Sequence, residues 1–202
     1  MTSSTIATWA EPVRWTADDL LRLSDAGFHF ELVQGELVRM APTGGSHGLR
    51  TGRLHGVLSA YVGTHGLGEI AAAETGFDLT QPGDAAQTVL APDIAFVRSE
   101  NVPLLDVEGY PRVVPDLVVE TASPNQSRDG LAGKARAWLH AGVRLVWVVW
   151  PKQRVVDVWL PGNEQPHATL GVDGTLDGGD VVPGFSYPVA ALFRYARIAG
   201  GR

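Results

Sequence analysis

The segment 117–150 does most to limit how this chain can fold. It contains an apolar run (LVVET, 117–121), a helical pattern (DGLAGKARAWLHAG, 129–142) that ends at Gly142, and a longer apolar run (VRLVWVVW, 143–150). A helix between two such runs is typical of a crossover that joins neighbouring parallel strands. The unbroken apolarity of 143–150 predicts a strand that is buried on both faces. A sheet covered by helices on both sides follows from these two expectations.

The other patterns along the chain favour a mixed sheet. Thr16 with Asp19 forms a capping box at a helix start, and Gln34-Gly35 is a two-residue hairpin turn. Pro92 interrupts an otherwise regular strand pattern. The further predicted elements are helices over 16–27 and 47–66, a hairpin over 28–40, and strands over 68–80, 89–97 and 155–160. We therefore expect an α/β fold of the α+β mixed-sheet kind. Helices flank its mixed central sheet, and an N-terminal helix and hairpin are added.

Length and composition indicate one soluble domain. The chain has 202 residues, of which 45% are hydrophobic and 19% are charged, as in ordinary globular proteins. We expect a single domain over 1–202, with 1–15 as a loosely ordered N-terminal arm. The absence of cysteine excludes disulfides and thiolate metal sites. No apolar run approaches the roughly 20 residues that span a bilayer, and no leader pattern is seen, so we expect a cytoplasmic protein without membrane contacts.

Two carboxylates occupy strand positions that look buried. Asp93 opens the strand of APDIAFV, and Glu120 ends the strand of PDLVVE. A buried carboxylate costs several kcal/mol unless it is paired or binds a metal. Mg²⁺ is held by one or two protein carboxylates together with water, so this pair is a candidate site for Mg²⁺ or Mn²⁺. The structural alternatives are a turn or cap role for Asp93 and an outward-pointing strand end for Glu120.

Lys134 lies on the helix that follows Glu120. An ammonium beside a metal-bound phosphodiester would stabilise the negative charge that develops in the transition state. Alternatively, Lys134 lays its stem over apolar surface beside Leu131 and Trp138 and keeps its charged head in water. Taken alone, the residue favours this second interpretation.

Five segments, in order, resemble the bacterial Uma-two family. They are FELVQGELV, SHGLRTGRL, APDIAFV, PDLVVETASPNQSRDGLAGKARAWLHAGVRLVWVV and VPGF. The family belongs to the PD-(D/E)XK restriction-endonuclease-like superfamily. The resemblance runs from about residue 16 to residue 193 and is most specific over 115–149. It implies a restriction-endonuclease-like core and a metal-dependent nuclease site.

The resemblance also implies roles for individual residues. Asp93 matches the Asp of the PD element, and Glu120 matches the acid of the second element. Both would bind the metal, with the backbone carbonyl of Thr121 as a third ligand. The superfamily motif places a lysine two positions after the acid, where this chain has Ala122. Lys134, on the next helix, matches a lysine that has moved there in this family.

Two further residues match family positions. Glu31 would be an additional acid near the metal, and its structural alternative is a paired hairpin carboxylate. His47 would contact phosphate or assist proton transfer, and its alternative is a helix-start residue. Candidate contacts to a DNA backbone, each also compatible with a solvated surface, are Arg50, Arg53, Arg128, Arg136 and Arg144.

Some residues depart from the family pattern. Trp150-Pro151 stands where the family usually has Asp-Pro, Trp138 replaces a tyrosine, and ETASPN replaces EVLSPS.

We expect a Mg²⁺- or Mn²⁺-dependent endonuclease that hydrolyses DNA phosphodiester bonds. We also expect a homodimer, because cutting both strands of a duplex needs two sites. The rival is a nucleic-acid- or protein-interaction module on the same fold with little or no catalysis. A net charge of −6 and Trp150 favour the rival, whereas the Asp93, Glu120 and Lys134 set favours the enzyme.

Overall fold

The computed structural model describes residues 13–27, 29–40 and 42–194, so nearly all of the expected arm over 1–15 lies outside the described residues. The helices are α1 (Ala17–Asp25), α2 (Gly45–His65), α3 (Arg128–Ala141) and α4 (Val189–Phe193), with a 3-10 helix over Ser99–Leu104. The strands are β1 (Phe30–Val33), β2 (Glu36–Arg39), β3 (Gly68–Ala72), β4 (Phe77–Asp78), β5 (Val89–Leu90), β6 (Ile94–Arg98), β7 (Leu117–Thr121), β8 (Leu145–Trp150), β9 (Val155–Trp159), β10 (Ala168–Leu170), β11 (Thr175–Asp177) and β12 (Ser186–Pro188).

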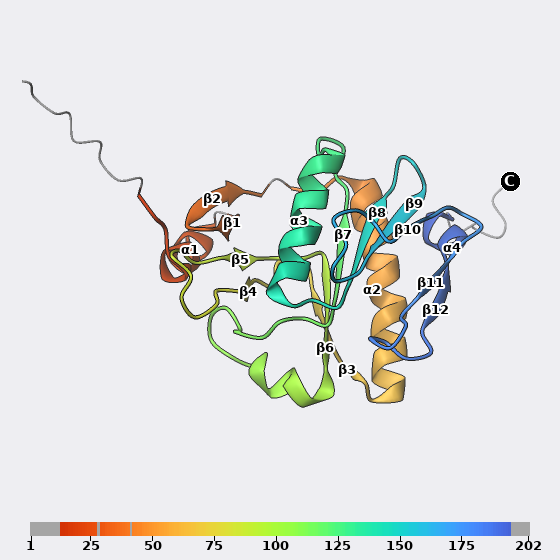
Figure 1. Cartoon of the computed structure of the whole chain (residues 1–202), viewed down its shortest axis with the longest axis horizontal. Coiled ribbons are helices and arrows are strands. Elements are labelled where there is room, and N and C mark those ends of the chain that lie inside the picture. The colour runs from red at the N-terminus through yellow and green to blue at the C-terminus, as the bar shows by residue number, and fades with distance from the viewer. Residues whose placement is uncertain (1–12, 28, 41, 195–202) are drawn as a thin grey trace, which may run out of the picture.

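A mixed six-stranded sheet forms the centre of the molecule, in the order β10-β9-β8-β7-β6-β3. β7 and β8 are parallel, and the other neighbouring strands of this sheet are antiparallel. α3 connects the two parallel strands and covers one face, while α2 covers the other (Figure 1). This confirms both the predicted crossover and the predicted mixed sheet flanked by helices.

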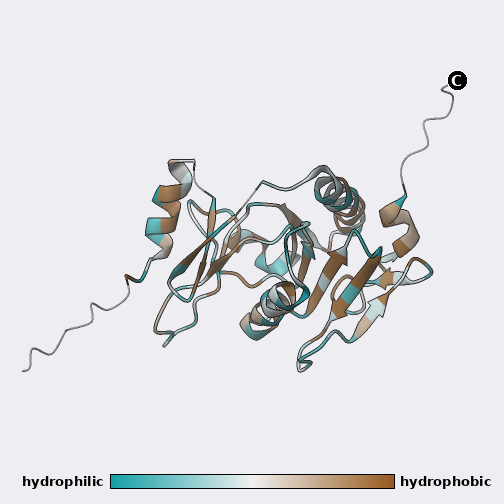
Figure 2. Cartoon of the chain, turned by 90° about the horizontal axis from the view of Figure 1, so that it is seen from above, coloured by the Kyte–Doolittle hydropathy of each residue, from teal (hydrophilic) through white to brown (hydrophobic). Residues whose placement is uncertain are grey.

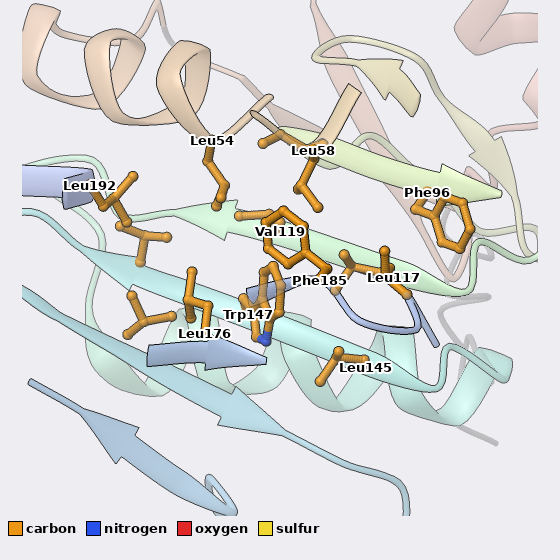
Figure 3. Packing of buried hydrophobic residues seen from close by; sticks show 14 of the residues in the cluster. Leu54, Leu58, Phe96, Leu117, Val119, Leu145, Trp147, Leu176, Phe185 and Leu192 are labelled. Atoms are coloured by element: carbon orange, nitrogen blue, oxygen red, sulfur yellow. The ribbon is translucent and has the colours of Figure 1, made fainter. Parts of the chain in front are cut away.

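β8 carries the core on both of its faces. All six of its residues are buried, and they alternate between two hydrophobic clusters. Leu145, Trp147 and Val149 face the cluster under α2, where Leu54 and Leu58 lie over the sheet (Figure 3). The opposite face packs against α3. The strands of the central sheet are accordingly among the most apolar parts of the fold (Figure 2).

The strand expected over 89–97 is divided between two sheets. β5 belongs to a four-stranded antiparallel sheet in the order β2-β1-β5-β4, whereas β6 belongs to the central sheet. Pro92 lies between them, because a residue without an N–H cannot continue the ladder. The chain therefore changes sheets at 91–93. Asp93 is left at the point where the two sheets meet. Ala91, two residues earlier, connects this point to β1, because its N–H donates to Oε1 of Glu31 at 2.8 Å.

The N-terminal elements also agree with expectation. The Thr16 capping box is present at the start of α1, and the hairpin turns at Gln34 (φ 49°) and Gly35 (φ 80°), which are the positive angles of a type I′ turn. The segment after Pro161 forms β10, β11, β12 and α4, none of which has a clear periodic pattern in the sequence. Within the described residues, no helix combines the length and apolarity needed to cross a membrane.

Candidate active site

Asp93 lies just before β6, at the end of the central sheet. Its Oδ2 accepts a hydrogen bond from the Thr121 N–H at 2.6 Å, and its own N–H donates to the Val119 carbonyl at 3.1 Å. His47, in the first turn of α2, places Nε2 at 3.0 Å from the same Oδ2. Among the described residues, no hydrogen-bond donor engages Oδ1. One carboxylate oxygen of Asp93 is thus anchored and the other has no bonding partner in this part of the chain.

Glu120 is buried on the α3 side of β7, with 4% of its surface exposed. The Lys134 ammonium lies 3.0 Å from its Oε1 and 3.1 Å from its Oε2, and the indole N–H of Trp138 donates to Oε1 at 2.8 Å. The alternative in which Glu120 points outward is therefore wrong. Trp138, a departure from the family's tyrosine, still supplies a donor to this carboxylate, a role that the sequence pattern did not reveal.

Lys134 reaches the site from α3 with its head group enclosed. Its Nζ lies 2.8 Å from Oε1 of Glu31 and donates to the Ala91 carbonyl at 3.2 Å, in addition to its contact with Glu120. Only 14% of the side chain is exposed. The interpretation that Lys134 keeps its head in water is thus wrong, since the ammonium bridges two buried carboxylates from different sheets.

His47 and Thr121 flank the site on its α2 side. His47 is 6% exposed, and its Nδ1 is a buried atom with no hydrogen-bond partner among the described residues. The hydroxyl of Thr51 donates to the hydroxyl of Thr121 at 2.9 Å, which ties α2 to the end of β7. The proposed use of the Thr121 carbonyl as a metal ligand stays a prediction.

The site holds more negative than positive charge. The Lys134 ammonium is shared by Glu31 and Glu120, whereas the Asp93 carboxylate contacts His47 and the Thr121 N–H. Burial raises the pKa of Glu120 to about 7; Lys134 opposes the rise, and the charges of Glu31 and Asp93 add to it. Burial by itself would lower the pKa of Lys134, but Glu120 and Glu31 outweigh it and the pKa is raised. Lys134 is therefore positively charged, and a further cation would relieve the repulsion among the carboxylates.

The donor set fits a hard divalent cation. Oδ1 of Asp93 is open, and Oε2 of Glu120 accepts only from Lys134 among the described residues, so it retains a lone pair. In the same part of the chain, no three His, Asp or Glu side chains converge as ligands of one ion. Mg²⁺ does not require three side-chain ligands, because it is commonly bound through one or two carboxylates and keeps several water molecules.

Comparison with known proteins identifies the family of this chain. A sequence profile of Uma2, described as "Putative restriction endonuclease", matches residues 17–190. This chain belongs to the Uma2 family. A crystal structure described as "a putative nuclease belonging to DUF820" from Anabaena variabilis is similar to this Uma2 chain with a TM-score of 0.71 and 19% identity, over 88% of this chain and 97% of that chain. The likeness confirms the restriction-endonuclease-like fold. A search of curated proteins found no match.

Trp150, where the Uma2 pattern usually has an acid, contacts a carboxylate from the neighbouring strand. Its indole N–H donates to Oδ2 of Asp157 at 2.7 Å. Asp157 is buried and also accepts from Arg128 at 3.2 Å and from the Thr169 hydroxyl at 2.5 Å. It lies opposite Val148 in the register, and Val148 lies opposite Glu120. This buried acid was not identified from the sequence, where Asp157 reads as one polar position within an alternating strand.

Most arginines considered as DNA contacts are occupied within the Uma2 chain. Arg53 donates to backbone carbonyls at the end of α4, and Arg136 donates to the Glu164 carbonyl. Arg144 and Arg128 are paired with Asp180 and Asp157. These four side chains serve the fold, so a DNA backbone would have to compete with their present partners.

The raised pKa of Glu120 predicts a pH-dependent stability. The folded protein binds this proton more tightly than the unfolded chain, whose carboxyl has a pKa near 4.5. The contribution of this proton to the free energy of unfolding is therefore fully present below pH 4.5 and is lost as the pH rises through about 7. Lys134 keeps its charge throughout this window. Glu120→Gln cannot ionise, so we expect its stability relative to wild type to increase by on the order of 1–3 kcal/mol between pH 4.5 and pH 8.

Urea unfolding in EDTA at both pH values measures this difference. Glu108→Gln is the matched control, because Glu108 is exposed and its variant should follow wild type at both pH values. An equal stability difference for Glu120→Gln at the two pH values would show that folding does not raise the pKa of Glu120.

Proposed function

We propose that this Uma2 protein is a Mg²⁺- or Mn²⁺-dependent endonuclease that hydrolyses phosphodiester bonds in DNA. The observation that carries the proposal is the buried pair of carboxylates, Glu31 and Glu120, that share the Lys134 ammonium. Asp93 is hydrogen-bonded to Thr121, the residue after Glu120, at the same end of the central sheet of a restriction-endonuclease-like fold. The family description, restriction endonuclease, supports the same reaction class. The proposal assigns the ion to Asp93 and Glu120, with the Thr121 carbonyl as a further ligand.

Each residue has a distinct task in this proposal. Such an ion, when bound, polarises the phosphodiester and lowers the pKa of a water molecule. Lys134 holds Glu120 in place and presents a positive charge to the non-bridging phosphate oxygens as they gain charge. Glu31 keeps Lys134 charged and aimed, since it offers the ammonium a second anionic partner at 2.8 Å. His47 orients Asp93 through Nε2, while its Nδ1 is buried and has no hydrogen-bond partner among the described residues.

A specific observation favours the rival function. Lys134 and Trp138 already compensate the burial of Glu120, so the fold tolerates this carboxylate without a metal. A nucleic-acid-binding module without catalysis would keep the same ion pair. The two functions differ in metal binding, which the enzyme requires and the module does not.

Titration calorimetry with Mn²⁺, followed by cleavage assays, tests the proposal. We expect one Mn²⁺ site per chain, and cleavage of supercoiled plasmid, linear duplex or single-stranded DNA that stops in EDTA. Sedimentation at the same protein concentrations would show whether a homodimer accompanies double-strand cleavage. Absence of Mn²⁺ binding at millimolar concentration, together with DNA binding, would establish the interaction module in place of the nuclease.

A further inference from the structure

A basic groove of about 780 Å³ adjoins the candidate active site. Its walls come from the start of α2, the turn after β8 and the end of α4, and its cationic residues are Arg50, Lys152, Arg154 and Arg194. Ser46, Pro151 and Phe193 complete the lining, which contains no carboxylate among the described residues. In a chain with a net charge of −6, such a local surplus of positive charge favours an anionic ligand.

The groove lies at the same end of the central sheet as the three carboxylates. Arg50 is one turn after His47 on α2, and both side chains are buried, so they share one helix face. His47 in turn contacts Asp93. On the other side, the turn 151–154 directly continues β8, the parallel neighbour of β7, which carries Glu120. A polymer that occupies the active site would therefore extend into this groove.

The turn 151–154 holds Arg154 in a backbone conformation that residues other than glycine rarely adopt. Arg154 has φ 56°, in the left-handed region, and its N–H donates to the Trp150 carbonyl at 2.9 Å. Hairpin loops usually place glycine or asparagine at such a position, because other residues are strained there. Within the described part of the chain, no ion pair engages Arg154 or Lys152. Both side chains are exposed, unlike the arginines that neighbouring acids hold.

We infer that this basic groove binds the sugar-phosphate backbone of a DNA strand beside the scissile phosphodiester, without reading the bases. The inference rests on the proposed function and deepens it. Cationic side chains neutralise phosphates independently of sequence, and the lining adds no amide side chain and no exposed aromatic ring that would engage a base. Because arginine can also pair with guanine, equal affinity for unrelated sequences is the property that distinguishes backbone binding. The groove therefore adds affinity and orientation next to the cleaved bond.

Binding of the full chain to labelled DNA in EDTA tests the inference. The probes are a 20-base-pair duplex (about two helical turns) in two unrelated sequences, and a single strand of the same length. We expect Lys152→Ala/Arg154→Gly to weaken binding roughly 10-fold and to reduce the slope of log K against log salt by about 1–2, equally for both sequences. Arg22→Ala, which removes an exposed cation from α1, is the matched control and should bind like wild type.

Arg154→Gly alone separates binding from folding. Glycine relieves the strain of the left-handed backbone, so the unfolding midpoint of this variant should equal or exceed that of wild type while its DNA affinity falls.

If wild type binds DNA and the double variant binds it with the affinity of Arg22→Ala, the groove inference is wrong and the nuclease proposal stands. An effect confined to one sequence would contradict backbone binding. If wild type binds no DNA, the groove inference falls, and if it also binds no Mn²⁺, the proposed function falls with it.

Discussion

Replacing Asp93 by asparagine is expected to abolish detectable Mn²⁺ binding and to lower single-turnover DNA cleavage by roughly 10³-fold or more. The reason is that asparagine keeps the size of the side chain and an oxygen acceptor for the Thr121 N–H, but loses the negative charge of one of the two proposed carboxylate ligands. Partners outside the ligand sphere already contribute about 10–100-fold in metal sites, so a ligand itself should contribute more. Calorimetry with Mn²⁺ and single-turnover cleavage of labelled duplex measure the two effects.

The Asp93→Asn variant should remain folded, which distinguishes a metal ligand from a turn residue. Its unfolding midpoint should be close to that of wild type, since the hydrogen bond to β7 is retained. Glu108→Gln removes one negative charge from an exposed site and should leave metal binding and cleavage unchanged. If Asp93→Asn binds Mn²⁺ and cleaves as wild type does, the turn or cap interpretation of Asp93 is correct.

Replacing Lys134 by alanine should reduce both stability and cleavage. At pH 8 we expect a loss of about 3–5 kcal/mol, because Glu31 and Glu120 are left buried without their counter-ion. The loss should be smaller at pH 5, since removing the ammonium raises the pKa of Glu120 further and lets it become neutral. Cleavage by the folded variant should fall by about 10²–10³, the usual effect of one preorganised electrostatic group.

Two variants make the Lys134 prediction specific. Lys152→Ala removes the other lysine of the chain, which is exposed, and should change stability by less than about 0.5 kcal/mol. Lys134→Arg keeps the charge but brings a planar, bulkier group into a narrow site, so it should restore stability better than cleavage. Urea unfolding at both pH values and single-turnover cleavage below the unfolding range measure these effects. Equal cleavage by wild type and Lys134→Ala would show that the ammonium serves only the fold.

The local architecture was largely predictable from the sequence because it depends on short-range patterns. The crossover from β7 through α3 to β8 follows from two apolar runs around a helical pattern that ends at Gly142. The N-terminal cap and hairpin follow from Thr16 with Asp19 and from Gln34-Gly35. Each of these signals acts over a few residues, through hydrogen bonds and dihedral preferences that do not depend on the rest of the fold.

The candidate site was only partly predictable, because its contacts join elements that are far apart in the chain. The sequence by itself determined that Asp93 and Glu120 stand at strand ends and that Lys134 lies on the next helix. Only the tertiary structure decided that Glu31, from a different sheet, shares the ammonium with Glu120, and that Trp138 donates to the same carboxylate. Periodicity assigns a side chain to a face of its own strand or helix, but burial and ion pairing depend on how separate elements pack. The basic groove has the same origin, since α2, the turn after β8 and α4 meet only in the folded protein.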